Sequence, residues 1–298
     1  MKNKNKSSNV SKVPYKAREI RYALLFLAPS LVGVSTFVFI PFLDVIRRSF
    51  LDTLGNQYKG LDNYISVLGN DAFHLAIKNT FCFCLVCIPS MLLLSLLVSL
   101  MLQRITLCNN LFKTLFLIPM VIPVASVVVL WKVLFFDNGV INNLLVQLGV
   151  NPIHWMDSGA SFTMLVISYT WKNMGYFMIL WLAGLSAIPT GIYEAASLDG
   201  AGRMQTFRYI TLPNLKSTIA MNLILALVNS FKVFREAYLV AGDYPEDHIY
   251  LLQHLFNNWF SQLDMEKMTA AAVIVTMVVT TFIIVVFKFE RRGGEEHE

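Results

Sequence analysis

The sequence predicts an all-α membrane protein with six transmembrane helices. Of its 298 residues, 56% are hydrophobic and only 14% are charged, and the mean hydropathy is +0.57, which is typical of membrane proteins. Six apolar runs are each long enough to cross a hydrocarbon core, which needs about 20 helical residues. One soluble core would instead require alternating polar and apolar faces along each element.

The six apolar runs follow one another with short polar connections between them. A polar tail at 1–21 precedes the first run, and an outer loop ends the first unit at 72. We expect the helices at 22–46, 78–103, 110–134, 161–187, 214–241 and 267–290. The connections are too short for an independent domain. Residues 73–290 therefore form one transmembrane domain of five helices, followed by a C-terminal tail at 291–298.

The distribution of lysine and arginine predicts the orientation of the chain. Fifteen of these residues lie in the N-terminal tail, the loop at 104–113, the stretch at 188–216 and the C-terminus, and six lie in the opposite connections. The positive-inside rule therefore places both termini in the cytoplasm, with the chain crossing the cell membrane. Arg47 and Arg48 are exceptions that face outward. No basic patch interleaved with stacking aromatics is present, so we do not expect nucleic-acid binding.

Neither catalysis nor cofactor binding is indicated by the reactive residue types. Cys82, Cys84 and Cys87 lie in an apolar run without a nearby histidine or carboxylate, so we expect them to pack as small apolar residues and not to bind a metal. The phosphate-binding pattern GxxxxGK[ST] does not occur in the sequence. We therefore expect a non-catalytic chain that holds no cofactor of its own.

One polar stretch, "YEAASLDGAGRMQTFRYITLP" at 193–213, separates two apolar runs. We expect two short helices here, with Thr190 as the N-cap of the first helix. Gly200 ends that helix, since glycine adopts a positive φ at little cost. Pro213 fits the first turn of the next membrane helix. The stretch is then a helix-turn-helix at the membrane surface, and an ordinary amphipathic connecting loop is the alternative.

The spacing of this stretch carries a family resemblance. Glu194-Ala195-Ala196 is followed after three residues by Gly200, and Ile210 and Leu212-Pro213 complete the pattern. This resembles, over 190–213, the EAA loop of permease subunits of ATP-binding-cassette (ABC) importers. The resemblance implies a type I importer fold and a set of residues that couple the chain to an ATPase: Glu194, Ala195, Ala196, Asp199, Gly200, Ile210, Leu212 and Pro213.

Further segments resemble sugar permeases of the carbohydrate-uptake group. "LFLAPSLVGVSTFVFIPFLDVIRRSF" and "SFKVFREAYLVAGDYP" carry this likeness, which covers nearly the whole chain after the tail. Two departures concern the outer end of the fifth helix. The family often has aspartate at the position of Arg235, and it often has Gly-Gly-Pro where this chain reads Gly-Asp-Tyr-Pro at 242–245.

The resemblance also implies partners and a location. These are a second permease subunit, two ATPase subunits that bind ATP and Mg²⁺, and an extracytoplasmic solute-binding protein, assembled in the plasma membrane of a prokaryote. The expected function is ATP-driven import of a sugar or oligosaccharide. A phosphorylated or cationic solute is an alternative substrate. A self-contained secondary transporter or channel is the competing class, although it would have no use for an EAA loop.

Polar residues in the fifth predicted helix indicate a substrate pathway. At 100° per residue they fall within an arc of about 140°. Ionisable side chains that face lipid cost several kcal/mol, so the arc should face protein or a water-filled path. The alternative is a structural pair between Lys232 and Glu236. The residues of the arc are Asn222, Asn229, Lys232, Arg235 and Glu236.

The fourth predicted helix offers a second candidate face. Tyr169, Asn173 and Tyr176 share one side of the helix, and Trp171 and Lys172 are expected to lie away from it. Aromatic rings stack on sugar rings and amides bind hydroxyl groups, so this set suits an uncharged carbohydrate. Interfacial aromatics or helix packing are the alternative.

Overall fold

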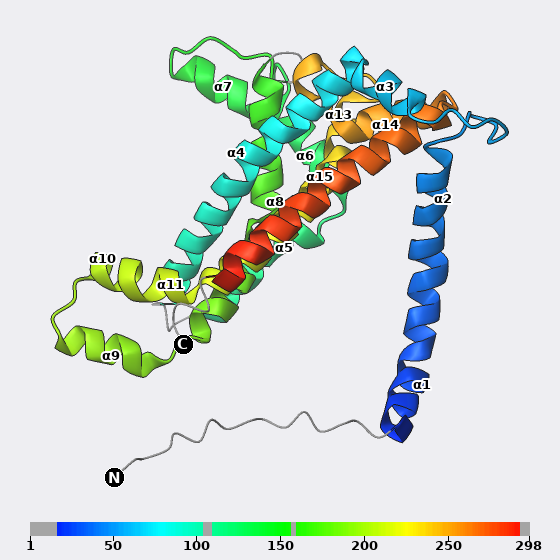
Figure 1. The fold of residues 1–298 in the computed structure, drawn as a ribbon. Helices are drawn as coiled ribbons and strands as arrows, with labels where there is room; N and C mark the ends of the chain where they lie inside the picture. Colours follow the sequence, from blue (N-terminus) through cyan, green and yellow to red (C-terminus); the bar gives the residue numbers. More distant parts are fainter. Residues whose placement is uncertain (1–16, 104–108, 156–158, 293–298) are drawn as a thin grey trace.

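The computed structural model describes residues 17–103, 109–155 and 159–292. Within this part the chain is helical apart from turns, loops and one isolated bridge between Leu51 and Tyr58, which confirms the all-α prediction. Most of the helices form a bundle, and one long helix stands apart from it (Figure 1). The predicted tails fall mostly on 1–16 and 293–298, outside the described residues.

The helix that stands apart is the first one. It runs without a break through α1 (Ala17–Val34), a π-helical turn η1 (Ser35–Phe39) and α2 (Ile40–Arg48). None of its most apolar window is buried, and large side chains such as Phe26 are exposed along it. Its outer end lies against α15. Such a surface requires lipid or another subunit around it.

The central pair of the bundle is α4 (Asp71–Leu102) and α8 (Ala160–Ser186). Two serines of α4 form hydrogen bonds across the interface. Ser99 Oγ donates to the carbonyl of Met178 at 2.9 Å, and Trp181 Nε1 donates to Ser95 Oγ at 3.1 Å. Small polar residues let membrane helices approach closely and form hydrogen bonds across the interface.

The third predicted helix, 110–134, is not one helix. It is divided into α5 (Asn109–Val121) and α6 (Val124–Phe135) at Pro123, because proline lacks an N–H and restricts the residue before it. Against α8, α5 packs so closely that a Cβ at Gly175 would lie 1.9 Å from the Phe116 carbonyl oxygen. Only glycine fits at that crossing.

The remaining helices complete the bundle and its outer cover. The predicted fifth helix comprises α12 (Lys216–Ser230), a 3₁₀ turn η3 (Phe231–Val233) and α13 (Phe234–Ala241). The outer side carries α3 (Asp62–Leu68), α7 (Val140–Gln147), η4 (Asp247–Ile249) and α14 (Leu252–Ser261). The last helix is α15 (Met265–Arg292).

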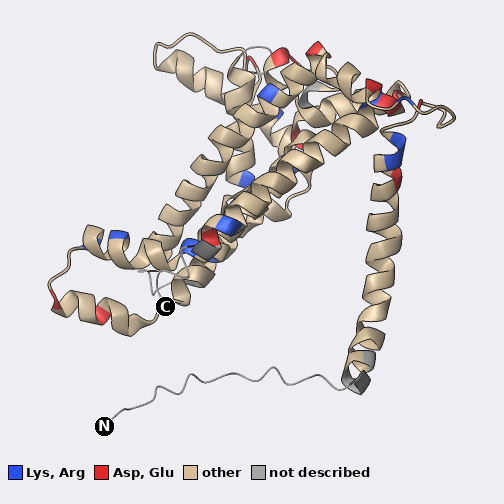
Figure 2. Cartoon of the chain, in the orientation of Figure 1, with Lys and Arg blue, Asp and Glu red and all other residues tan. Residues whose placement is uncertain are grey.

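By length and composition, five helices in the described part can cross a membrane. The count becomes six when α8 and the following helix, which is bent from it by 68°, are taken as one broken span. Charged residues gather at both ends of the bundle, and a few lie along its length (Figure 2). The free-standing first helix is almost without charges between its ends (Figure 2).

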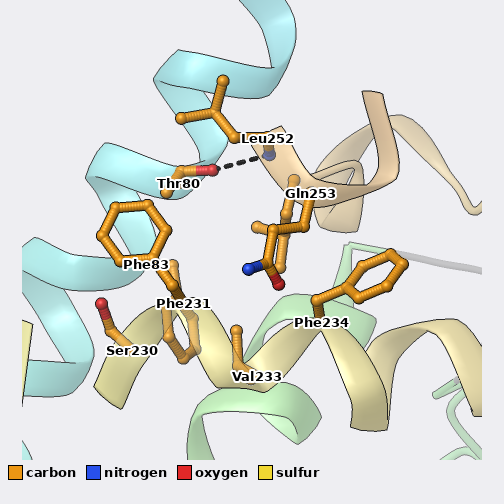
Figure 3. A pocket seen from close by; sticks show the side chains of 9 residues that line it. Thr80, Phe83, Ser230, Phe231, Val233, Phe234, Leu252 and Gln253 are labelled. Atoms are coloured by element: carbon orange, nitrogen blue, oxygen red, sulfur yellow. Dashed lines mark hydrogen bonds between the residues drawn. The ribbon is translucent and has the colours of Figure 1, made fainter. Parts of the chain in front are cut away.

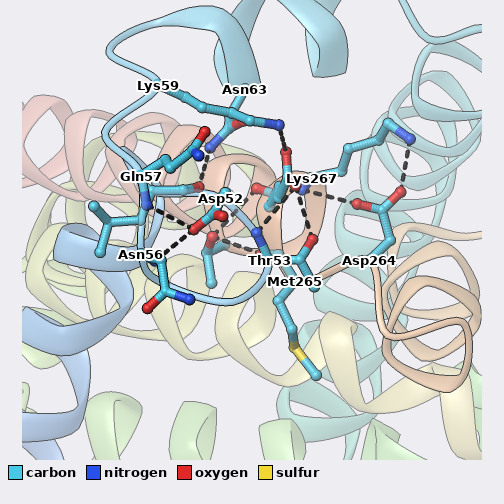
Figure 4. Close-up of polar contacts among 12 residues, drawn as sticks. Asp52, Thr53, Asn56, Gln57, Lys59, Asn63, Asp264, Met265 and Lys267 are labelled. Atoms are coloured by element: carbon cyan, nitrogen blue, oxygen red, sulfur yellow. Dashed lines mark hydrogen bonds and ion pairs between the residues drawn. The ribbon is translucent and has the colours of Figure 1, made fainter.

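A set of polar contacts at the outer end ties the first helix to the last (Figure 4). Glu266 of α15 accepts from Lys59 Nζ at 2.6 Å and from the N–H and hydroxyl of Thr53. Hydrogen bonding to Glu266 raises the pKa of Lys59 above its ordinary value. Asn63 donates to two carbonyls of the same loop. The free-standing helix is therefore fixed to the bundle at this end.

Candidate functional site

The stretch at 190–213 is a helix-turn-helix at the end of the bundle opposite α3 and α7 (Figure 1). Its first helix is α9 (Thr190–Leu198). The turn has the two hydrogen bonds of a Schellman motif, from Ala201 N–H to Ala196 O at 2.9 Å and from Gly200 N–H to Ser197 O at 3.2 Å. Gly200 has φ +76°, which confirms the predicted role of glycine in this turn.

The second arm of the stretch consists of α10 (Arg203–Thr206), a π-helical turn η2 (Phe207–Thr211) and α11 (Leu212–Asn214). The N-cap prediction was wrong, since Pro189 occupies the cap and Thr190 is the first helical residue. Pro213 lies in the short α11, which directly precedes the membrane helix α12. It therefore lies about one turn before the position that was predicted, the first turn of the membrane helix.

The two arms contact each other, and much of α9 is exposed on the surface of the chain. Tyr193 Oη and Thr211 Oγ1 are 3.1 Å apart. Glu194, Ala195 and Asp199 are exposed, and Leu198 is 89% exposed at the tip. The tip of the stretch therefore combines an exposed apolar side chain with two exposed carboxylates. Of the other predicted coupling residues, Leu212 is exposed, whereas Ala196 and Ile210 are partly buried.

A cavity of about 680 Å³ lies between this stretch and the inner end of α4. Leu97 and Leu100 form part of its wall, and Tyr193 and Phe207 contribute from the two arms. The two arms thus contact the core through Tyr193 and Phe207 and leave open space beside these contacts.

The predicted polar arc of the fifth helix is divided by the fold. Asn222 and Glu236 are buried, whereas Lys232 and Arg235 are exposed and Asn229 is partly exposed. Lys232 Nζ donates to Asn229 Oδ1 at 2.6 Å. Both amide atoms of Asn222 are buried without a hydrogen-bond partner among the described residues. The arc is therefore not one continuous stripe.

Glu236 pairs with Lys172 of α8, and not with Lys232 as the sequence alternative had it. The Nζ–Oε1 distance is 2.8 Å, and the two residues are 8% and 6% exposed. The expectation that Lys172 lies away from the face of Tyr169, Asn173 and Tyr176 stays a prediction. The lysine in the apolar run "SYTWKNMGYF" was the only signal available, and one chain segment cannot show which helix carries its partner.

The predicted face of α8 is mostly closed. Tyr169 is 2% exposed and packs edge-on against Phe83 at 5.5 Å between ring centroids. Asn173 Nδ2 donates to the Tyr169 carbonyl of its own helix at 2.9 Å. Tyr176 is partly buried beside the core. The roles of these three residues in sugar binding stay predictions.

A small cavity lies between α4, the break in the fifth helix and the start of α14. Figure 3 shows side chains from these three elements around it, with Thr80 Oγ1 accepting from the Leu252 N–H at 3.0 Å. Phe83, Phe231 and Phe234 line it. The volume is about 10 Å³, which holds about one water molecule. Sequence patterns gave no sign of this aromatic cluster, since apolar residues are common everywhere in the chain.

The start of α14 closes the outer side of this cavity. His254 is fully buried there, and its Nδ1 accepts from the Leu251 N–H at 3.1 Å. Burial lowers the pKa of His254 to about 4, so the ring is neutral at pH 7.

Comparison with known proteins gives a consistent result. Residues 102–292 match the family described as binding-protein-dependent transport system inner membrane component. The chain is 32% identical to the lactose transport system permease protein LacF of Rhizobium radiobacter over 72% of this chain and 74% of that protein. It is 30% identical to the trehalose/maltose permease protein MalF of Thermococcus litoralis over 94% and 97%.

Further similarity is found in sequence and in structure. The chain is 31% identical to the arabinooligosaccharides permease protein AraP of Bacillus subtilis, over 72% of this chain and 71% of that one. A chain of a bacterial ABC transporter that imports the acidic polysaccharide alginate has the same fold. The TM-score is 0.79 at 23% identity, with 92% of this chain and 98% of that chain covered.

Proposed function

Because the chain belongs to the family of inner-membrane components of binding-protein-dependent transport systems, we propose that it is a transmembrane subunit of an ATP-driven importer for a sugar or oligosaccharide. The proposed substrate class rests on the agreement among the relatives in the kind of solute for which they are named. Their transport systems are named for lactose, trehalose/maltose and arabinooligosaccharides, and the trehalose/maltose relative aligns with nearly the full length of both chains.

The translocation path lies between this chain and a second permease subunit. The cavity within the chain at the break of the fifth helix is too small for a sugar. Lys232 and Arg235 nevertheless point outward from a membrane-spanning segment, and lipid is an unfavourable environment for them. A second subunit that covers this face would complete a polar path. The free-standing first helix also leaves apolar surface for such a subunit.

ATP hydrolysis is coupled to transport through the exposed loop at 190–213. ATP and Mg²⁺ bind to two separate ATPase subunits, so this chain needs no cofactor of its own and acts without catalysis. Glu194 and Leu198 of α9 present a charge and an apolar tip to the ATPase. The Schellman turn at Gly200 transmits a push on α9 to the second arm and from there to α12.

The orientation follows from the same assignment. The loop at 190–213, the start of α1 and the end of α15 lie at one end of the molecule (Figure 1), and this end faces the cytoplasm of a prokaryotic cell. The opposite end, with α3, α7 and α14, receives sugar from an extracytoplasmic binding protein.

Purification of the tagged chain from its native membrane tests the proposal. The expected co-purifying chains are a second permease, an ATPase and the binding protein. Proteoliposomes that contain this complex should take up labelled oligosaccharides only when ATP is present on the side of the membrane that carries the ATPase subunits. ADP on that side should not support uptake. Transport by the chain alone, driven by a proton or sodium gradient, would contradict the proposal.

A further inference from the structure

Two cations share the outward face of the broken fifth helix. Lys232 lies in the 3₁₀ turn η3, and Arg235 lies in the first turn of α13. Both side chains are exposed, and both lie within the apolar segment Lys216–Tyr238 that is long enough to cross a membrane. Residues three apart on a helix are neighbours on one face. The pair therefore concentrates two positive charges in one place near the outer end of this segment.

The chain itself does not neutralise these charges. Glu236 is the nearest carboxylate in sequence, but it turns inward to Lys172 at 2.8 Å. Lys232 donates to the neutral amide oxygen of Asn229. Among the described residues, neither Lys232 nor Arg235 has a carboxylate within 4.0 Å. The structure thus turns Glu236 toward Lys172 and leaves Lys232 and Arg235 without a carboxylate partner among the described residues.

Uncompensated cations in this position are costly unless something outside the chain pairs with them. A lysine or arginine near the end of a membrane helix costs less than the roughly 2.5–3.5 kcal/mol of one at the centre, but two neighbouring cations still favour an anionic partner. A neutral sugar would need only hydroxyl-binding groups, which amides such as Asn229 supply. An anionic group, by contrast, would form charge-assisted hydrogen bonds with both side chains, and arginine binds carboxylates with two parallel bonds.

We infer that the transported sugar carries an anionic group, such as the carboxylate of a uronic acid, which Lys232 and Arg235 bind as it passes along the path. This rests on the proposed function, because the outward face is a path only if a second permease covers it. A cationic solute is excluded by the same charges.

The test uses the complete complex with its binding protein in proteoliposomes, and two matched probes. The probes are galacturonic acid trisaccharide and its methyl ester, with maltotriose as a neutral reference. We expect ATP-driven uptake of the acid to exceed that of the ester and of maltotriose by at least tenfold. The double variant Lys232→Gln/Arg235→Gln should lose at least tenfold of the acid uptake. Lys78→Gln, which removes an exposed lysine on α4, should lose none.

Three results would overturn the inference. Equal uptake of the ester and the acid that survives in the double variant would leave the sugar function intact but remove the anionic requirement. Loss of the second permease from the purified double variant would mean that the cations pair with an acid of that subunit. Absence of uptake for all three probes, with ATP hydrolysis still stimulated by the binding protein, would count against the sugar function itself and thus against the inference.

Discussion

Replacing Lys172 with methionine should strongly destabilise the bundle. The lysine and Glu236 are 2.8 Å apart and are 8% and 6% exposed. At an effective dielectric constant of about 20, their attraction is about 6 kcal/mol before desolvation is subtracted. In Lys172→Met, the Glu236 carboxylate stays buried with no partner, because its Oε2 already has none. Breaking a buried pair in this way costs about 3–5 kcal/mol.

The double variant Lys172→Met/Glu236→Met distinguishes the pair's net contribution from the cost of an orphaned charge. Two apolar side chains of similar length remove both desolvation penalties, so we expect stability within about 1 kcal/mol of the unaltered chain, or above it. Lys78→Met serves as the control, because Lys78 is exposed on α4 and surface changes of this kind stay within about 0.5 kcal/mol.

The assay is reversible unfolding of the chain in mixed micelles with an increasing fraction of sodium dodecyl sulfate, followed by the fluorescence of its five tryptophans. A loss of 3–5 kcal/mol lowers the folded-to-unfolded ratio by roughly a hundredfold to several thousandfold. A single variant that loses less than about 1 kcal/mol would refute the reasoning. So would a double variant as unstable as the single one, because the burial of an unpaired charge would then not be the cause.

Three further predictions concern the path, the topology and the packing. Asn229→Leu should lower uptake by about 2- to 10-fold, the worth of one hydrogen bond, with the complex still assembled on a sizing column; unchanged uptake kinetics would assign the residue to packing. Cysteines introduced at Asn138 and Glu246 should react with a membrane-impermeant maleimide added outside intact cells, and labelling only after lysis would reverse the orientation. Gly175→Ala should lower thermal stability by about 1–3 kcal/mol through overpacking at the α5–α8 crossing, whereas Gly33→Ala, with open space at its Cβ, should not; equal effects would show that the close approach is unimportant.

The elements that depend on local composition were predictable from the sequence. The fourth helix was expected at 161–187 and is found at Ala160–Ser186, because a long apolar run with few breakers has a single solution in a membrane. The turn at Gly200 was predictable for a similar reason, since the residues of the turn alone decide its backbone conformation. Both cases need no knowledge of the remaining chain.

The elements that depend on distant neighbours were not predictable. Helical periodicity places Glu236 beside Lys232 and gives no sign that Lys172, 64 residues away, is its partner. The Pro123 break, by contrast, had a local signal, since a proline within a helical run ends or bends the helix. Apolar composition also could not distinguish the free-standing first helix from the packed α4, because lipid and protein are both apolar surroundings.

The central claim is that a separate ATPase drives transport through the loop at 190–213. Uptake and ATPase retention by the purified complex, measured together for Gly200→Val, test it most directly. Valine at φ +76° is strained by about 1–3 kcal/mol, so both short arms should be displaced. Gly149→Val is the matched control, since Gly149 has φ +77° and open space at its Cβ but lies just after α7 on the outer side.

We expect Gly200→Val to abolish uptake and to release the ATPase, while the chain still inserts in the membrane and Gly149→Val retains both activities. Glu194→Lys should act in the same direction, because a charge-assisted contact with the ATPase is worth about 1.5–3 kcal/mol. Full uptake by Gly200→Val and Glu194→Lys, with the ATPase still bound, would contradict the account.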